Sequence, residues 1–394
     1  MTPGPASIPK SCFLSIGIFA WNEEEGIAST LDSLFRQSLF RELPDLGLHC
    51  EVVIVANGCS DLTAEVAEGS LARQGRQHCR PEGFEGRVAR IPRPGKVNAW
   101  NEYVHSISAG GARYLFMMDA DILIHRADTL WNMVKTLERH AEASVVVDRP
   151  CKDLKFKNRK SLREGLSLAA SQMTSAAEAQ LCGQLYGIRS EAARSIYLPR
   201  DLAACEDGIL KALVCTDNLA HEVWPSRIRL ADGAEHTFKA YTSPAAVLRN
   251  QKRQIIGQTM VHLLIDQEIP ALPSGQRQNL AATLRERDES DPNWFRRVVE
   301  RHVRQARYFW RLYPGQLSQG FRRLRKLEMA RRMWCLPTAV AWWGLTLIAS
   351  WLAYRTLKSG CVAYWPKVKR ASADFTDPVS LSLPFEKSQA CGGK

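Results

Sequence analysis

Apolar and polar positions alternate in blocks along the first 150 residues of the chain. Short apolar runs rich in β-branched and aromatic residues predict strands, and apolar residues spaced three or four positions apart predict helices between them. The predicted strands lie at 13–20, 51–56, 87–91, 114–118 and 144–147, and the predicted helices at 27–35, 62–72, 95–104 and 127–140. This alternation predicts an α/β fold with a mostly parallel, doubly wound sheet that helices cover on both faces.

Polar clusters follow three of these strands at their carboxyl ends, at residues 22–24, 57–61 and 119–121. In parallel sheets, ligands bind beyond the carboxyl ends of the strands, so the clusters predict an active site at this edge. A G-x-G-x-x-G motif does not follow the first strand, which disfavours a dinucleotide cofactor. The PGKV sequence at 94–97 lacks the upstream glycine and the Ser/Thr of a P-loop.

Positive charge is concentrated in the second half of the chain. The net charge is +12, and residues 294–332 hold twelve Lys or Arg against two Glu. The next 22 residues, 333–354, carry no charge and include four tryptophans. A helix of this length would match a hydrocarbon core of about 30 Å. The pattern predicts basic interfacial helices and a membrane-associated helix at an anionic membrane surface, with a single span, an interfacial helix and a buried soluble helix left open.

Other features bear on the cellular compartment and on excluded partners. Residues 1–10 lack an apolar signal core, and arginines beside the apolar run favour the cytoplasmic side, although the basic residues after the run make this orientation signal mixed. The eleven cysteines include no C-x-x-C pair, which predicts reduced thiols and no zinc site. Because no nucleic-acid recognition module accompanies the basic segment, we expect no nucleic acid as a partner. The expected location is the cytoplasmic face of the inner (plasma) membrane.

Several side chains are candidates for chemistry, and each has a structural alternative. Asp119 and Asp121 offer two hard oxygen ligands for Mg²⁺ or Mn²⁺, although D-x-D pairs also arise by chance. Glu206 and Asp207 supply a candidate general base, or simply first-turn acids of a helix. Lys96 and the basic residues at 249–253 suit a pyrophosphate, or a solvated helix face.

Seven short motifs follow one another over about 240 residues. They are 20–24 (AWNEE), 56–61 (ANGCSD), 95–101 (GKVNAWN), Asp119-x-Asp121, 183–189 (GQLYGIR), Glu206-Asp207 and 251–254 (QKRQ) with Gly257 after it. In this order they resemble the motifs of the inverting glycosyltransferases of family 2, which have the nucleotide-sugar-binding GT-A fold.

This resemblance implies a role for each matching residue. Asp207 would be the general base that deprotonates the acceptor hydroxyl, with Glu206 beside it. Asp121, with Asp119, would hold Mg²⁺ or Mn²⁺. The residues implied to bind the nucleotide sugar are Ala20, Asn22, Glu24, Asn57, Asp61, Lys96, Asn101, Asp119, Arg189, Gln251 and Arg253.

The resemblance also implies a division of the chain. After an N-terminal tail at 1–11, residues 12–150 would form the nucleotide-sugar half and 151–260 the acceptor and catalytic-base half of a GT-A domain. The basic interfacial helices would occupy 261–332, the membrane-associated or transmembrane helix 333–354, and a basic flank with a loose tail 355–394.

The expected function is metal-dependent, inverting transfer of a sugar from a nucleotide sugar, a UDP-sugar first, to a hydroxyl of a lipid-linked saccharide or lipid in exopolysaccharide or envelope glycan synthesis. Two departures from the family motifs leave a catalytically impaired sugar-nucleotide-binding scaffold at the membrane as the alternative. Ala56 and Asn57 stand where aspartates are usual, and Gln254 stands where synthases of long polymers have Trp. A nucleotidyltransferase is disfavoured because no glycine-rich basic loop follows the first strand. His236 is expected to be structural rather than a metal or phosphate ligand.

Overall fold

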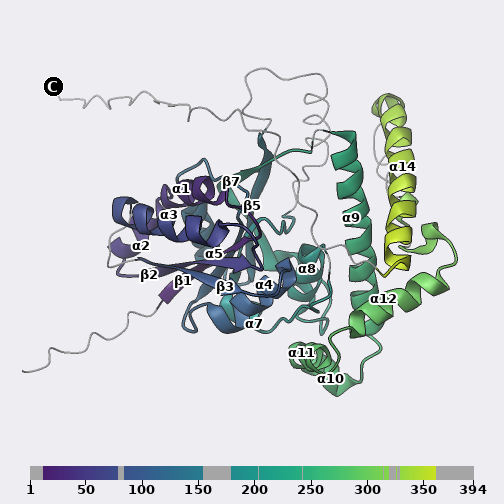
Figure 1. Cartoon of the computed structure of the whole chain (residues 1–394), viewed down its shortest axis with the longest axis horizontal. Helices are drawn as coiled ribbons and strands as arrows, with labels where there is room; N and C mark the ends of the chain where they lie inside the picture. The colour runs from purple at the N-terminus through teal and green to yellow at the C-terminus, as the bar shows by residue number, and fades with distance from the viewer. Residues whose placement is uncertain are drawn as a thin grey trace, which may run out of the picture.

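A central sheet organises the protein. The computed structural model describes residues 12–78, 84–153, 179–202, 204–241, 243–313, 315–318, 325 and 329–360. In these residues a seven-stranded sheet lies between two layers of helices (Figure 1). Its strands are β1 (Cys12–Ala20), β2 (His49–Asn57), β3 (Phe84–Ile91), β4 (Tyr114–Asp119), β5 (Val145–Lys152), β6 (Leu185–Arg189) and β7 (Ile228–Phe238).

The strand order is β3-β2-β1-β4-β6-β5-β7. Strands β1 to β4 are parallel, β5 is parallel to β7, and β6 runs antiparallel to both of its neighbours. The prediction of an α/β fold with a mostly parallel sheet is therefore confirmed. The reversal of β6 pairs Leu185 with Met118 and Arg189 with Tyr114, so the start of β6 lies at the carboxyl edge of β4.

Alternation along the strands divides the core into two layers. Leu14, Ile16 and Ile18 of β1 face one helical layer, whereas Val53 and Val55 of β2 face the other. The first layer contains α1 (Ile27–Phe35), α2 (Leu39–Asp45), α3 (Thr63–His78) and α5 (Thr129–Arg139), and the second contains α4 (Lys96–Glu102), α7 (Ser190–Arg194), α8 (Glu206–Thr216) and α9 (Pro244–Leu263). Every strand in the middle of the sheet is thus covered on both faces, which explains the nearly continuous apolar runs.

The C-terminal part adds helices to the second layer. They are α10 (Ser274–Gln278), α11 (Leu280–Ser290), α12 (Trp294–Gln305) and α14 (Met329–Lys358). The apolar face of α12, formed by Trp294, Phe295, Val299 and Val303, is buried in the same core as α8 and α9. The expectation that this face lies on a membrane is wrong for α12, because the protein itself covers it. The second basic helix expected near residues 321–327 lies largely outside the described residues.

Helix α14 contains the whole apolar run 333–354 and lies beside α9 (Figure 1). Ala349, Ala353 and Leu357 of its second half are buried in the core that includes α9. Other apolar side chains of α14 are exposed, among them Met333, Leu336, Val340, Trp342 and Ile348. In the described part of the chain, no helix is both long enough and apolar enough to cross a bilayer.

A buried carboxylate connects the C-terminal helices to the sheet domain. Asp288 of α11 is 1% exposed. One of its oxygens accepts hydrogen bonds from the Tyr197 hydroxyl at 3.1 Å and the Arg200 backbone N–H at 2.8 Å. The other oxygen accepts from the indole N–H of Trp294 at 2.7 Å, where α12 begins. Asp288 therefore joins α11, the start of α12 and the segment after α7.

We expect Asp288→Asn to lower the free energy of unfolding by about 1–3 kcal/mol, because an amide NH₂ would face donors that need an acceptor. Urea unfolding of the full chain, followed by tryptophan fluorescence, would measure the change. Glu289→Gln, at the neighbouring exposed position, is the matched control and should change stability by less than about 0.5 kcal/mol. Equal stability of the two variants would refute this role for Asp288.

Candidate active site

The loops after β1 and β2 are joined by side-chain hydrogen bonds at the carboxyl edge of the sheet. Asn22 adopts a φ of 56° and its Oδ1 accepts from the Ser60 backbone N–H at 2.7 Å. Glu24 accepts from the Leu62 N–H at 3.0 Å through Oε2. Asp61 accepts from the Thr63 N–H at 3.1 Å and so caps the start of α3. The structure thus brings Asn22, Glu24 and Asp61 together. Their side-chain oxygens accept hydrogen bonds from backbone N–H groups and so stabilise the two loops.

Asn57 differs from its neighbours because it has an open acceptor. It ends β2 and is only 4% exposed, and its Oδ1 has no hydrogen-bond partner among the described residues. The backbone here is tightly held, since Gly58 has a φ of 60° and a Cβ at this position would lie 2.8 Å from Pro94 N. Ala20 ends β1 close by, fully buried. A buried acceptor without a partner is costly, so this position favours a ligand that supplies a donor.

Lys96 connects three separate parts of the chain. Its Nζ lies 2.6 Å from Asp119 Oδ1 at the end of β4 and 2.9 Å from Glu206 Oε1 at the start of α8. The ammonium also donates to the Gly183 carbonyl at 2.8 Å, just before β6. Four of the seven motifs seen in the sequence therefore meet at one charged group.

The charges in this cluster shift one another's protonation. Burial disfavours the Lys96 ammonium, but the carboxylates of Asp119 and Glu206 outweigh it and raise the pKa of Lys96. Burial likewise disfavours the ionised form of Glu206, but Lys96 overcomes this effect and the pKa of Glu206 is lowered. For Asp119 burial prevails over the Lys96 ammonium and raises the pKa. Glu206 is thus held as a carboxylate whose charge is already compensated.

Asp207 stands beside Glu206 in a different environment. The acidic pair follows Cys205, whose φ of 62° lies in the left-handed region, and Asp207 accepts from the Gly208 N–H at 2.9 Å. Burial, together with the negative charge of Glu206, raises the pKa of Asp207 to about 6. Two adjacent carboxyls with pKa values moved in opposite directions suit different roles, and the one near neutrality suits proton transfer.

Two glycines allow the close packing around this acidic pair. A Cβ on Gly183 would lie 2.8 Å from Glu206 Oε1. A Cβ on Gly257 of α9 would lie 2.5 Å from Cys205 Sγ and 2.9 Å from the Ala204 carbonyl oxygen. Any side chain at either position would displace the segment that carries Glu206 and Asp207.

Asp207 opens into a cavity of about 470 Å³ between α8, α9 and Tyr313. The cavity is lined by Gln180, Leu181, Cys205, Asp207, Gly208, Lys211, Gln254, Gln258, Val261, His262, Ile265, Asp266 and Tyr313. It is a mixed polar and apolar space next to the candidate base, as an acceptor site requires. Of these residues only Asp207 and Gln254 belong to the sequence motifs, and Cys205 is one of the eleven cysteines.

Asp119 and Asp121 are the residues available for a metal ion. They flank Ala120 just after β4, and the charge of Asp121 contributes to the raised pKa of Asp119. Asp121 is exposed. Among the described residues no three His, Cys, Asp or Glu side chains lie close enough together to hold a metal ion. Two aspartate carboxylates are hard oxygen donors of the kind that Mg²⁺ and Mn²⁺ prefer, and such a cation would take its other ligands from diphosphate oxygens and water.

Two of the residues expected to bind the donor lie elsewhere. Arg189 ends β6, and because β6 is antiparallel it lies at the opposite edge of the sheet from Asp119, where it donates to the carbonyls of Leu137 and Ala143 at 2.7 Å each. Asn101 is buried in α4 and exchanges hydrogen bonds of 2.7 and 3.1 Å with the backbone of Leu198. For both residues the expectation is corrected: their hydrogen bonds hold the fold.

The remaining expected residues lie on α9 and β7. Arg253 is close enough to the acidic pair for its positive charge to offset part of the rise in the pKa of Asp207. Gln251 lies on the same helix. His236 is fully buried on β7, and its Nδ1 lies 2.7 Å from Asp148 Oδ2. This pairing agrees with the structural role expected for His236.

Comparisons with known proteins give a distant structural likeness. The chain resembles the crystal structure of TarS 1–349 from S. aureus, with 16% sequence identity and a TM-score of 0.43, over 88% of this chain and 90% of that one. It also resembles a glucosyl-3-phosphoglycerate synthase from Mycobacterium tuberculosis crystallised with Mn²⁺, UDP-glucose and phosphoglyceric acid, with 15% identity and a TM-score of 0.41, over 62% of this chain and 78% of that one. No curated protein sequence matches the chain.

A family model matches part of the sequence. The family model described as "Glycosyl transferase family 2" matches residues 15–195, from β1 to just past α7. This segment contains Asn57, Lys96, Asp119 and Asp121. The chain therefore carries, over residues 15–195, a region that matches glycosyltransferase family 2.

Proposed function

We propose that this protein transfers a sugar from a nucleoside diphosphate sugar to a hydroxyl of a lipid-linked saccharide or lipid, with inversion at the anomeric carbon. A UDP-sugar is the favoured donor. The observation that carries the proposal is the cluster of Lys96, Asp119, Glu206 and Asp207. It places a compensated charge pair next to a carboxyl whose pKa is raised to about 6, at the mouth of a cavity.

The donor side uses the carboxyl edge of β1, β2 and β4. The open Oδ1 of Asn57 is suited to accept a hydrogen bond from a pyrimidine edge. Asp119 and Asp121 would hold a divalent cation, which would supply charge neutralisation for the leaving diphosphate. Lys96, already paired with Asp119, places a fixed positive charge at the same position.

Asp207 acts on the acceptor side. Its ionised carboxylate accepts the proton of the acceptor hydroxyl while that oxygen bonds to the anomeric carbon. The bond from this carbon to the diphosphate oxygen breaks in the same step, and the diphosphate leaves with the electron pair. One base on one face and the leaving group on the other give a single displacement, and hence inversion.

A scaffold that binds sugar nucleotides without turnover is the second candidate, because Ala56 and Asn57 stand where aspartates are usual. The arrangement of Glu206 and Asp207 favours the enzyme, since a pure binding protein has no need of adjacent carboxyls with divergent pKa values. Location at the cytoplasmic face of the plasma membrane is part of the same proposal. The exposed Trp342 and Ile348 of α14 are its support.

The first test replaces the base. We expect Asp207→Asn to lower kcat by about 10²–10⁴-fold while donor binding is retained, because the amide cannot accept the hydroxyl proton. Calorimetry gives donor affinity and release of the nucleoside diphosphate gives turnover. Asp232→Asn, at an exposed position on β7, is the matched control. Turnover by Asp207→Asn at the wild-type rate would exclude this role.

The pH profile provides an independent readout for the same residue. Because only the ionised carboxylate accepts a proton, and the pKa of Asp207 is raised to about 6, kcat should be constant above that pH. Below it, kcat should fall about tenfold for each pH unit. A rate that stays level from pH 7 to pH 5 contradicts the assignment.

The second test concerns the metal and the donor. We expect Mn²⁺ to strengthen calorimetric binding of one among UDP-, GDP- and dTDP-glucose, and Asp121→Ala to weaken this binding by at least about tenfold. Chelation of the metal should have the same effect as the substitution. Asp232→Ala serves as the control. Metal-dependent binding that survives in Asp121→Ala would place the cation elsewhere, and no binding of any donor would favour a redirected pocket.

The third test concerns the membrane. We expect the double variant Trp342→Ala, Ile348→Ala to lower partitioning to phosphatidylglycerol vesicles by at least about tenfold, because two large apolar side chains no longer enter the interface. Co-sedimentation with vesicles measures the partitioning. Trp224→Ala, a tryptophan 40% exposed on a loop away from α14, should bind vesicles as the wild type does. Equal partitioning of all three proteins would remove α14 from the proposal.

A further inference from the structure

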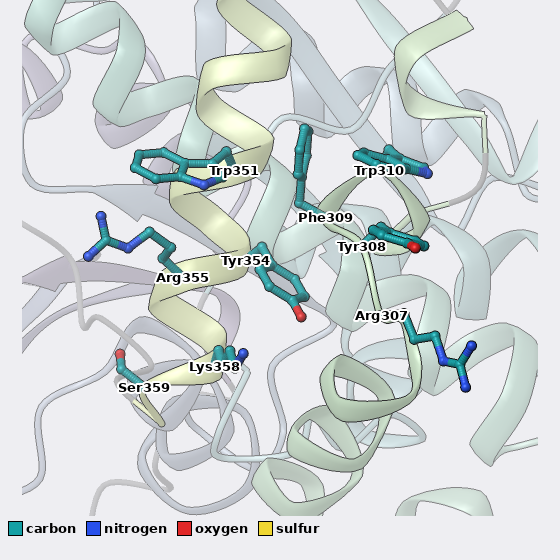
Figure 2. A pocket seen from close by; sticks show the side chains of 9 residues that line it. All are labelled: Arg307, Tyr308, Phe309, Trp310, Trp351, Tyr354, Arg355, Lys358 and Ser359. Atoms are coloured by element: carbon teal, nitrogen blue, oxygen red, sulfur yellow. The ribbon is translucent and has the colours of Figure 1, made fainter.

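A second hollow lies outside the site described above. It has a volume of about 620 Å³ and lies between the last turns of α14 and the 307–310 turn, which contains η5 (Phe309–Arg311). Its lining consists of Arg307, Tyr308, Phe309, Trp310, Trp351, Tyr354, Arg355, Lys358 and Ser359, here called the aromatic groove. Figure 2 shows its two walls, with Trp351 and Tyr354 on α14 and the other three rings on the facing turn.

The rings of the groove are ordered and accessible. Tyr308 and Trp310 stack with ring centroids 4.6 Å apart and planes 4° from parallel, and Phe309 meets Trp310 edge-on at 4.9 Å. Nevertheless Tyr308 is 49% exposed, Trp310 47% and Trp351 44%. These large apolar surfaces therefore stay uncovered in the folded chain, although their positions are set.

Three cations border the same rings. The Arg355 guanidinium lies 4.9 Å from the centre of the Trp351 ring, and Lys358 Nζ lies 5.8 Å from that of Tyr354. In the described part of the protein neither of them, nor Arg307, forms an ion pair with a carboxylate. Within the described residues, the groove thus presents positive charge without a carboxylate partner.

Backbone features fix the two walls relative to each other. Arg307 has a φ of 53°, in the left-handed region that non-glycine residues rarely adopt, and it begins the turn that carries the three rings. Arg296 of α12 donates to the Gly360 carbonyl at the end of α14. Leu312 is fully buried after the turn, and its carbonyl lies 3.0 Å from His302 Nε2. Both walls of the groove are therefore tied to α12.

The groove is also continuous along the chain with the cavity that holds Asp207. The turn at 307–310 forms one wall of the groove, and Tyr313, three residues later, lines the cavity and contacts the His262 ring at 5.8 Å. One short segment of the chain, residues 307–313, therefore contributes to both hollows.

From these observations we propose that the aromatic groove binds an anionic glycan, as a remote subsite for the acceptor chain; this inference rests on the proposed transferase function. The negative faces of aromatic rings attract the polarised C–H groups of sugar rings, and the three cations pair with phosphate or carboxylate groups. Aromatic side chains that bind a bilayer project from the protein surface, whereas the rings here line a hollow. This arrangement favours a chain molecule over a bilayer.

The test uses the full chain and measures binding without any donor sugar. The probes are phosphorylated dextran, polygalacturonate and unmodified dextran, followed by calorimetry and by quenching of tryptophan fluorescence. We expect one of the two anionic polymers to bind, which also separates phosphate from carboxylate as the recognised group, and unmodified dextran to bind at least about tenfold more weakly.

Two variants then address rings and charges separately. Trp310→Ala should weaken binding of the anionic polymer by about tenfold. The double variant Arg355→Gln, Lys358→Gln should remove most of the preference over unmodified dextran. The matched controls are Trp224→Ala, an exposed tryptophan outside the groove, and Arg301→Gln with Arg304→Gln on the exposed side of α12, and both should bind as the wild type does.

The outcomes separate this proposal from the transferase function. Asp207→Asn should bind the polymer normally, so lost turnover in that variant says nothing against the groove. Wild-type affinity in both groove variants, or no binding of either anionic polymer, would overturn the proposal. Vesicle binding that falls in Trp310→Ala while polymer binding does not would instead make the groove a membrane contact.

Discussion

The rest of the site depends on the ion pairs and the hydrogen bond of the Lys96 ammonium. The ammonium joins Asp119 at the end of β4, Glu206 at the start of α8 and the Gly183 carbonyl before β6. These elements are separated by up to 110 positions in the chain, and each would be destabilised by a buried charge or carbonyl without a partner. The ion network therefore sets the distance between the donor edge of the sheet and the helix that carries Asp207. The network also makes the two acidic residues differ. Lys96 pairs with Glu206 and lowers its pKa, whereas burial and the negative charge of Glu206 raise the pKa of Asp207.

Local patterns were sufficient to predict the parallel strands and the polar residues at their carboxyl ends. Asn22, Asn57 and Asp119 follow apolar runs directly, and parallel strands bring such residues to one edge. The prediction for Arg189 is wrong for a reason of topology. Arg189 shares a motif with Gly183, but β6 is antiparallel and carries the two ends of that motif to opposite edges of the sheet. Strand direction is a property of long-range pairing, and no local pattern encodes it.

The C-terminal helices show a second limit of sequence patterns. An apolar helix face with basic residues around it can pack on a bilayer or on a protein, since both remove apolar area from water. For α12 the covering surface is the core that includes α8 and α9, secured by the three hydrogen bonds to Asp288. Helix α14 combines both characters, with Ala353 buried against the protein and Trp342 exposed. The small residues Ala349 and Ala353 on one face permit close packing with α9. In the sequence they are part of one continuous apolar run, which does not show which face packs on the protein.

The boundary of the family match coincides with a division of labour in the structure. The matched residues 15–195 supply the open acceptor of Asn57, the cation of Lys96 and the pair Asp119 and Asp121, to which we assign the donor in our proposal. Asp207, most of the lining of the cavity beside it and the aromatic groove lie after this segment. Donor chemistry is shared by enzymes that transfer from nucleotide sugars, whereas acceptors differ in shape and charge. A wall built from α9, α14 and the turn between Arg307 and Tyr313 can therefore change with the acceptor while the Lys96 network stays in place. For this reason the family match bears on the donor side of the proposed reaction, and the acceptor has to be inferred from the chemistry of these later residues.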